Sequence, residues 1–352
     1  MIRRLSVVLV ALALLAACGG GGKKAAPTTT TTTTTLATTT TAPPPEFPLT
    51  GVVATDLAKL KRPALVVKID NADGSGPANQ ARPQMGLNQA DVVYEEMVEG
   101  SVTRLAAIFH SGDSDPVGPI RSFRTTDVAV FTPLHNPLFA WSGANVDFLE
   151  ILRNSALIDV GYDAASEVYG RRDIHVGPHD LYSATPDLFA LAPPEAVPPP
   201  PLFVFRKPTE TTPTGAPNVQ SIHVEFGGGA GSAPADWHWN AIKGGFDRDQ
   251  KGTPHVDENG EQVAPENVVV HFVDYVDTGY VDPSGASVPE AQMVGTGECW
   301  VLTKGVLIQG TWSKPAEDAV TTYADVAGAP IKLTPGQTWV ELAPNGGASI
   351  SG

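Results

Sequence analysis

The chain has 352 residues, of which 23 are basic and 38 acidic, and its formal net charge is −15. An electrostatic field of that sign makes nucleic acid and anionic lipid surfaces poor partners. The chain contains only two cysteines, Cys18 and Cys299, so at most one internal disulfide could form.

The first 17 residues have the features of an export signal. Two arginines precede an apolar run ending at Ala17, which is shorter than the roughly 20 residues of a spanning helix. Residues 15–18, Leu-Ala-Ala-Cys, resemble the lipobox of bacterial lipoproteins, whose cysteine carries diacylglycerol. We predict a signal peptide over 1–17 and lipid on Cys18, which would anchor the chain outside the cytoplasm on the outer face of the cell membrane. The alternative is an ordinary secretory signal with an incidental cysteine.

Residues 18–46 are predicted to form an extended, disordered stalk. They contain threonine runs at 28–35 and 38–41, then three prolines, and almost no large apolar residues. Such a composition cannot bury a core, and proline and β-branched threonine stiffen it. At about 3.1 Å per residue the stalk could reach on the order of 80 Å into the cell wall. Its composition is also typical of O-glycosylated stalks.

The remaining residues are predicted to form two domains of an α+β protein. Roughly 300 residues exceed what one hydrophobic core usually serves. Prolines are concentrated after Ala192, which places a Pro-rich linker over 193–219. We therefore predict a mixed α/β domain over 47–192 and a β-rich domain over 220–345.

In the first predicted domain, apolar runs typical of strands surround one run with helical spacing. The turn Glu99-Gly100-Ser101 separates two of these strands and predicts a hairpin. The predicted strands cover 64–70, 91–98, 102–110 and 139–141, and the predicted helix covers 146–152.

In the second predicted domain almost every pattern indicates a strand, with short turns such as Lys304-Gly305 between them. Cys299 lies in one of these patterns, so we expect it to be buried and structural, and a lipidated Cys18 could not pair with it. The predicted strands cover 221–226, 267–275, 299–303, 306–312, 330–334 and 338–342.

The densest group of charged residues extends from Lys68 to Arg124. Because successive strand residues face opposite sides, Glu95 and Glu96 cannot both point into one pocket. If the hairpin loop has three residues, Glu96 faces Arg104, and one interpretation is a cross-strand ion pair.

The alternative interpretation is a ligand site. Arg82, Arg121 and Arg124 would converge on a carboxylate or phosphate, which guanidinium forks suit better than lysine does. Gly118-Pro119 before two of these arginines would allow a tight backbone turn toward a ligand.

A second polar cluster lies at residues 171–182. His175 and His179 are four residues apart, but Gly177-Pro178 breaks the helix that would align them, and no third ligand has a recognisable spacing. We therefore predict no metal site, and His179 is interpreted as a pocket residue, an acid/base group or a structural cap. Since nucleophile-elbow, phosphate-loop and dinucleotide-binding motifs are also missing from the sequence, no cofactor is predicted.

These stretches resemble the YerB-like lipoprotein family, a family of unknown function with N-terminal and C-terminal parts. The resemblance extends from about Phe47 to Ala343. It implies a lipoprotein with two parts, but no reaction. Asp180 departs from the family's usual asparagine after Pro-His, and its charge would repel an anion bound beside it. The matching stretches are 67–71, 81–87, 90–96, 99–104, 116–122 and 178–182 in the first half, and 239–240, Phe246, Arg248, 252–255, 266–270, 310–312 and 335–339 in the second.

We predict that the protein binds a cell-wall polymer, a peptide or an envelope protein through a polar cleft of the first domain. One alternative is a hydrolase or transferase acting on the wall, with a glutamate from 95–99 and His179 as acid and base. Another is a structural scaffold held together by buried ion pairs. The candidate ligand-binding residues are Lys68, Asp70, Asn71, Arg82, Glu95, Glu96, Arg104, Arg121, Arg124, His179 and Tyr182.

Overall fold

The computed structural model describes residues 43–74, 76–228, 232–282 and 285–351. The predicted signal peptide, Cys18 and the predicted stalk up to residue 42 lie outside these ranges. From Pro44 onward the chain forms one compact unit. Within the described ranges, no helix is long and apolar enough to cross a membrane.

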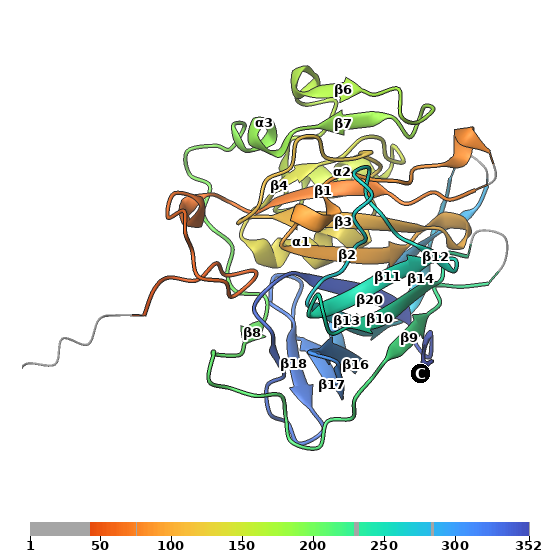
Figure 1. Ribbon diagram of the computed structural model, residues 1–352. Coiled ribbons are helices and arrows are strands. Elements are labelled where there is room, and N and C mark those ends of the chain that lie inside the picture. Colours follow the sequence, from red (N-terminus) through yellow and green to blue (C-terminus); the bar gives the residue numbers. More distant parts are fainter. Residues whose placement is uncertain (1–42, 75, 229–231, 283–284, 352) are drawn as a thin grey trace, which may run out of the picture. The chain divides into compact units, whose positions relative to one another are not determined.

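A large mixed sheet, ten strands within the described residues, contains strands from both halves of the sequence (Figure 1). The halves join at β20, which pairs in parallel with β2 on one side and with β13 on the other. The strand order is β18 (Thr322–Asp325), β17 (Val306–Lys314), β16 (Gly295–Thr303), β13 (Asn267–Val273), β20 (Thr338–Pro344), β2 (Val92–Met97), β3 (Thr103–Phe109), β1 (Leu65–Asp70), β4 (Leu138–Ala140) and β5 (Ile158–Asp159).

A second antiparallel sheet packs on one face of the large sheet. Its Trp237 and Phe246 are buried in one hydrophobic cluster with Val67, Val93 and Trp339 of the large sheet. Burial of such aromatic side chains is a major source of packing energy. The second sheet has the order β12 (Thr253–Pro254), β11 (Gly245–Gln250), β10 (Ala235–Asn240), β9 (Ser221–Val224) and β21 (Ala348–Ile350).

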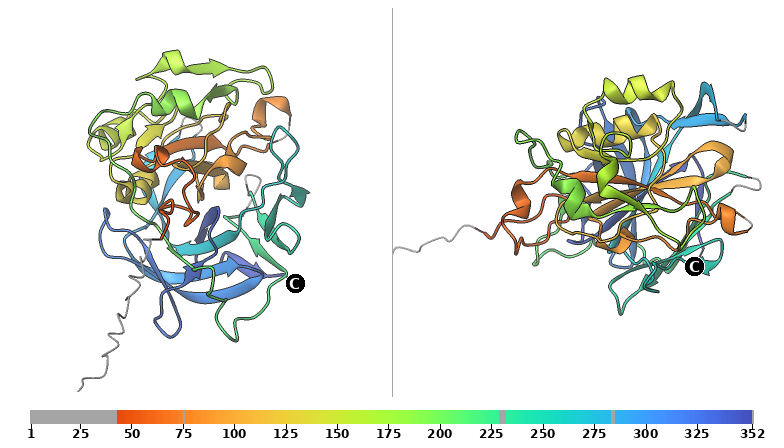
Figure 2. Two further views of the ribbon diagram at one scale, coloured as in Figure 1. Left: turned by 60° about the vertical axis from the view of Figure 1, so that its left-hand side comes forward. Right: turned by 90° about the horizontal axis from the view of Figure 1, so that it is seen from above.

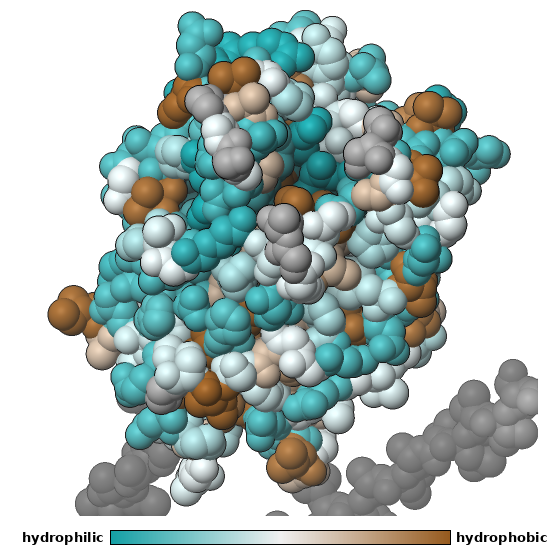
Figure 3. All heavy atoms as spheres, turned by 90° about the vertical axis from the view of Figure 1, so that its right-hand side faces the viewer, coloured by the Kyte–Doolittle hydropathy of each residue, from teal (hydrophilic) through white to brown (hydrophobic). Residues whose placement is uncertain are grey.

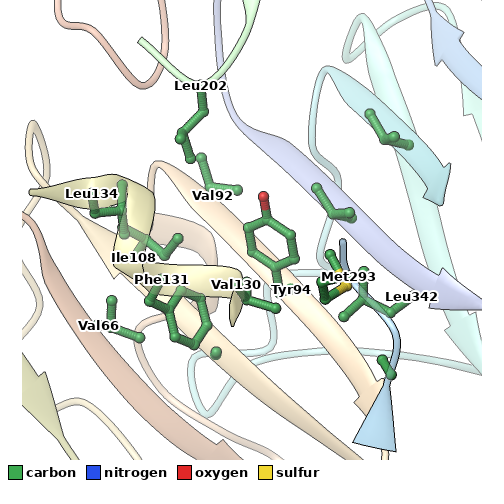
Figure 4. Packing of buried hydrophobic residues seen from close by; sticks show 14 of the residues in the cluster. Val66, Val92, Tyr94, Ile108, Val130, Phe131, Leu134, Leu202, Met293 and Leu342 are labelled. Carbon is green, nitrogen blue, oxygen red and sulfur yellow. The ribbon is translucent and has the colours of Figure 1, made fainter. Parts of the chain in front are cut away.

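Two short helices and a hairpin cover the opposite face. They are α1 (Thr126–Phe131), α2 (Phe148–Arg153) and the hairpin of β14 (Tyr275–Val281) and β15 (Ser287–Ala291). Seen from above, the yellow helices lie on one side of the orange strands and the teal second sheet lies on the other (Figure 2). Phe131 of α1 packs near Val66 and Ile108 of the large sheet (Figure 4).

The remaining elements are short and connect or flank these layers. The strands are β6 (Tyr169–Arg171), β7 (Leu181–Ser183), β8 (Val204–Phe205) and β19 (Lys332–Leu333), and the third helix is α3 (Thr185–Phe189). The 3-10 turns are η1 (Lys59–Lys61), η2 (Pro77–Asn79), η3 (Leu87–Gln89), η4 (Glu99–Ser101), η5 (Thr132–Leu134) and η6 (Ser166–Val168).

The predicted fold class, a mixed α/β region followed by a β-rich region, is confirmed. The strand predicted over 330–334 is only two residues long, since Pro330 has no N–H for a ladder and the partner strand β8 is equally short. Cys299 is fully buried, as expected, and burial raises the pKa of its thiol to about 12. The division at 193–219 stays a prediction, and strands from both sides of that segment share the large sheet.

Candidate functional site

Charged residues occur on both faces of the large sheet where β1, β3 and β2 lie side by side. Asp70 lies opposite Arg104, and Arg104 lies opposite Glu96, so these three share one face. Glu95 points to the other face, where its carboxylate accepts hydrogen bonds from Arg248 and Thr103. Glu95 and Glu96 therefore lie on opposite faces of the sheet, as the alternation of strand residues predicted.

A cavity of about 860 Å³ opens on the Asp70 face. Its walls come from the segment after β1, from η4, from the loops around residues 121–124 and 143–146, from the loop before β7 and from the β14–β15 hairpin. This side of the molecule is hollowed and largely hydrophilic (Figure 3). We call it the arginine cavity, and its charged lining residues are Asp70, Glu99, Arg104, Arg121, Arg124, His179 and Asp282.

Asp70 organises one end of the arginine cavity. Its Oδ2 accepts hydrogen bonds from Arg121 Nε at 2.9 Å and lies 2.7 Å from His179 Nδ1. Burial by itself would raise the pKa of Asp70, but the His179 hydrogen bond and the charges of Arg104 and Arg121 lower it to about 2. Asp70 is therefore a carboxylate at neutral pH, and it fixes the positions of Arg121 and His179.

His179 has hydrogen-bond partners at both ring nitrogens. Nε2 lies 3.1 Å from the Ala78 carbonyl oxygen, and Nδ1 faces Asp70. The ring therefore bridges η2 to the end of β1. Both of its nitrogens face oxygen atoms of the protein.

Two further arginines surround Glu99. Arg124 donates from Nη2 at 2.6 Å and from Nε at 3.0 Å to the same Glu99 oxygen. Arg104 is farther away, with its Nη1 4.0 Å from that oxygen. Its Nε and Nη1 are buried without a hydrogen-bond partner among the described residues. Burial, with the charges of Arg124 and Arg121, lowers the pKa of Arg104 to about 10, so the guanidinium is still charged at neutral pH.

Lys68 and Glu96 lie beneath the cavity rather than in its lining. The Lys68 ammonium is fully buried and donates to Glu96 at 2.5 Å and to Asp127 at 2.8 Å. The predicted Glu96–Arg104 ion pair is therefore wrong, because Glu96 pairs with Lys68 instead. The predicted register, with Glu96 opposite Arg104, is right. Burial and the nearby Glu96 carboxylate raise the pKa of Asp127 to about 7, against the charge of Lys68.

The opposite face carries a closed cluster, in which Glu95 pairs with Arg248 of β11. Arg248 Nη2 donates to Glu95 at 2.6 Å, and both side chains are 0% exposed. Asn71 Nδ2 lies 2.8 Å from the Thr103 hydroxyl and 3.1 Å from Gln250. The second sheet covers this face, so Glu95 and Asn71 belong to the packing between the two sheets and not to the arginine cavity.

Sequence reasoning missed three members of the closed cluster as site residues: Arg248, His255 and Glu341. Trp237 donates from Nε1 to Glu341 at 2.7 Å, and burial together with the Glu95 charge raises the pKa of Glu341. Burial and the charge of Arg248 lower the pKa of His255, whose Nδ1 lies 2.6 Å from Arg248 Nη1. The available signal was Glu341 itself, a single acidic residue inside the apolar run 339–343.

Arg82 and Tyr182 do not join the arginine cavity. Arg82 pairs with Asp73, so the predicted convergence of Arg82 with Arg121 and Arg124 is wrong. The third arginine in the lining of the cavity is Arg104. Spacing alone could not show which of these arginines lie together. Tyr182 is buried, and the guanidinium carbon of Arg172 lies 4.8 Å from the centroid of the Tyr182 ring.

Within the described ranges, no group of three or more His, Cys, Asp or Glu side chains could hold a metal ion. His175 Nε2 lies 3.0 Å from the Pro83 carbonyl oxygen, so it faces a different group from His179. Asp180 pairs with Arg171 and does not line the arginine cavity, so it would not repel an anion there.

Two family models match the chain. Residues 49–196 match the N-terminal domain of the family described as Protein of unknown function (DUF3048), and residues 222–340 match its C-terminal domain. The "Putative lipoprotein YerB" of Bacillus subtilis (strain 168) is 26% identical in an alignment 315 residues long that covers 86% of this chain and 88% of that protein. The crystal structure of the YerB protein from Bacillus subtilis matches with a TM-score of 0.72 at 23% identity, over 87% of this chain and 99% of that chain. The structural likeness shows a shared fold.

Proposed function

Because the chain belongs to the DUF3048 family, as its resemblance to YerB-like proteins implied, we propose that it is a membrane-anchored envelope lipoprotein with a binding function. The arginine cavity would bind a cell-wall component or an envelope partner. The single observation that carries this proposal is a cavity lined by three guanidinium groups, of which one has buried donors without a hydrogen-bond partner among the described residues.

The lipid anchor is supported by the lipobox-like residues 15–18 and by the name of the Bacillus relative. We expect the chain in bacterial cells to begin at Cys18, to carry diacylglycerol and to sediment with membranes. Mass spectrometry of the N-terminal peptide tests this, with Cys18→Ser as the variant that should leave the membrane fraction. An intact leader on a protein found in the cytosol would contradict the anchor.

The geometry supports binding rather than acid–base catalysis. Glu96 is buried against Lys68, and Glu95 lies on the opposite face of the sheet. Glu99 lines the cavity, but Arg124 holds one of its carboxylate oxygens, and both ring nitrogens of His179 face oxygen atoms of the protein. A general base must reach the proton that it removes, and of the three glutamates Glu99 alone lines the cavity, beside an arginine that binds it.

Retention on isolated cell envelopes tests the binding function. The chain from residue 18 onward, with Cys18→Ser so that lipid plays no part, is mixed with purified cell walls and with envelope membranes, and the bound fraction is measured. We expect retention that is lost with Arg104→Met and kept with Arg153→Met, a change of the same type at an exposed position on α2. Equal retention of all three proteins, or none of any, would contradict binding in the arginine cavity.

A further inference from the structure

We propose that the arginine cavity binds a peptide that ends in a free carboxylate and carries small apolar side chains, an inference that rests on the proposed function and names its ligand class. Unsatisfied guanidinium donors lie at one end of the cavity. The acidic residues of the lining are already engaged, and much of the remaining wall is apolar.

The first feature is the set of free donors. Arg104 Nε and Nη1 are buried and have no hydrogen-bond partner within the described residues. Among the described residues Arg121 donates to Asp70 through Nε, and its side chain is 26% exposed and lines the cavity. A buried donor without an acceptor costs free energy, which a bound anion would recover. Two guanidinium forks suit a planar carboxylate.

The second feature is that the acidic residues of the lining are held by other partners. The Asp70 carboxylate is hydrogen-bonded to Arg121, to His179 and to the backbone N–H of Ala72. Glu99 accepts two hydrogen bonds from Arg124. Asp282 accepts a hydrogen bond from the backbone N–H of Ala286 in the same turn. Glu99 lies 4.0 Å from Arg104 Nη1, beyond hydrogen-bond distance, so among the described residues Arg104 Nε and Nη1 keep unused donors.

The third feature is the apolar remainder of the wall. It comes from small and β-branched residues of five segments: Ala72, Ala78, Val98, Val102, Ala144, Val146, Pro178, Val281 and Val288. A wall of this kind next to a single charged end fits a ligand with one terminal charge and small side chains. It does not fit a chain of phosphodiesters, which the net charge of −15 would also repel.

The dimensions agree with a short peptide. A volume of about 860 Å³ lies within the range of roughly 300–1,000 Å³ that is usual for small-ligand sites. The backbone groups of a peptide would meet polar side chains at Ser122 and Asn145. Asn145 also donates to the Val281 carbonyl at 3.2 Å, which fixes the hairpin beside the α2 loop.

Calorimetric titration with matched peptides tests the ligand class. The chain with Cys18→Ser, from residue 18 onward, is titrated with alanine tripeptide as the free acid and with the same peptide amidated at its C-terminus. The last residue is used in both the L and the D form, to separate a protein C-terminus from a wall peptide as the source. Inorganic phosphate is added as a competing anion.

We expect the free acid to bind and the amide to bind roughly tenfold to a hundredfold more weakly, and Arg104→Met to cause a loss of the same size. If Arg104→Met does not fold, Arg121→Met is the second variant, and Arg153→Met is the control that should bind normally. Equal binding of acid and amide, tighter binding of phosphate, or no peptide binding by a protein that cell walls still retain would overturn the ligand class and leave the proposed function standing. If cell envelopes also failed to retain the protein, both the ligand class and the proposed binding function would be overturned.

Discussion

The arginine cavity and the closed cluster are built on the same three strands, from similar residue types, and they lie on opposite faces. In the closed cluster the Glu95–Arg248 pair is fully buried under the second sheet. In the arginine cavity the side chains of Arg121 and Asp70 are 26% and 2% exposed, and the hairpin β14–β15 leaves an opening. Residue types therefore do not separate an open cavity from a packing contact, whereas the element that covers the face does.

Removing Arg248 should have the largest effect. Arg248→Met leaves the buried Glu95 side chain without its ion-pair partner, and breaking such a buried pair typically costs about 3–5 kcal/mol of unfolding free energy. Urea unfolding followed by tryptophan fluorescence measures the loss. The double variant with Glu95→Leu should recover part of it, because no charge is then left unpaired.

The matched control for that experiment is Arg171→Met. Arg171 pairs with Asp180 at the surface, and its side chain is 61% exposed, so the expected change is below about 1 kcal/mol. If Arg248→Met cost no more than Arg171→Met, the closed cluster would not hold the two sheets together, and the contrast between the two faces would fail.

Neutralising Asp70 should have an intermediate effect that depends on pH. Its pKa is about 2 in the folded chain, below the ordinary value of 3.8, so the carboxylate stabilises the fold above about pH 4. This contribution is on the order of 2 kcal/mol and is lost as the pH falls from about 4 to about 2. Asp70→Asn should lack both the stabilisation and that part of the pH dependence, which urea unfolding between pH 2 and 7 would show. An unchanged slope in the variant would be evidence against the Asp70–His179–Arg121 arrangement.

Removing Arg121 should have the smallest effect on stability and a clear effect on ligand binding. Because its side chain is partly exposed, Arg121→Met should lower the unfolding free energy by less than about 1 kcal/mol. Thermal unfolding and peptide titration on the same sample separate the two effects. A stability loss above about 2 kcal/mol without a change in binding would place Arg121 with the structural residues.

Several features of the site followed from the sequence. The alternation of strand residues put Glu95 and Glu96 on opposite faces, and the three-residue loop fixed the register that places Glu96 opposite Arg104. Both depend only on the two-residue repeat of a strand and on the length of one turn, so they are local properties. Arg121, Arg124 and His179 were singled out from their sequence context, and the structure brings all three to one cavity.

The sequence by itself determined the charge, the α+β class, the strands of the hairpin and the faces on which their side chains lie, because each depends on neighbours a few residues apart. Only the tertiary structure decided which face is closed and which is open. Arg248 reaches Glu95 from 153 residues farther along the chain, and β20 inserts between β2 and β13. Such contacts depend on how distant segments pack, and no local pattern encodes them. The same packing pairs Glu96 with Lys68 instead of Arg104, and it leaves Arg104 Nε and Nη1 without a hydrogen-bond partner among the described residues.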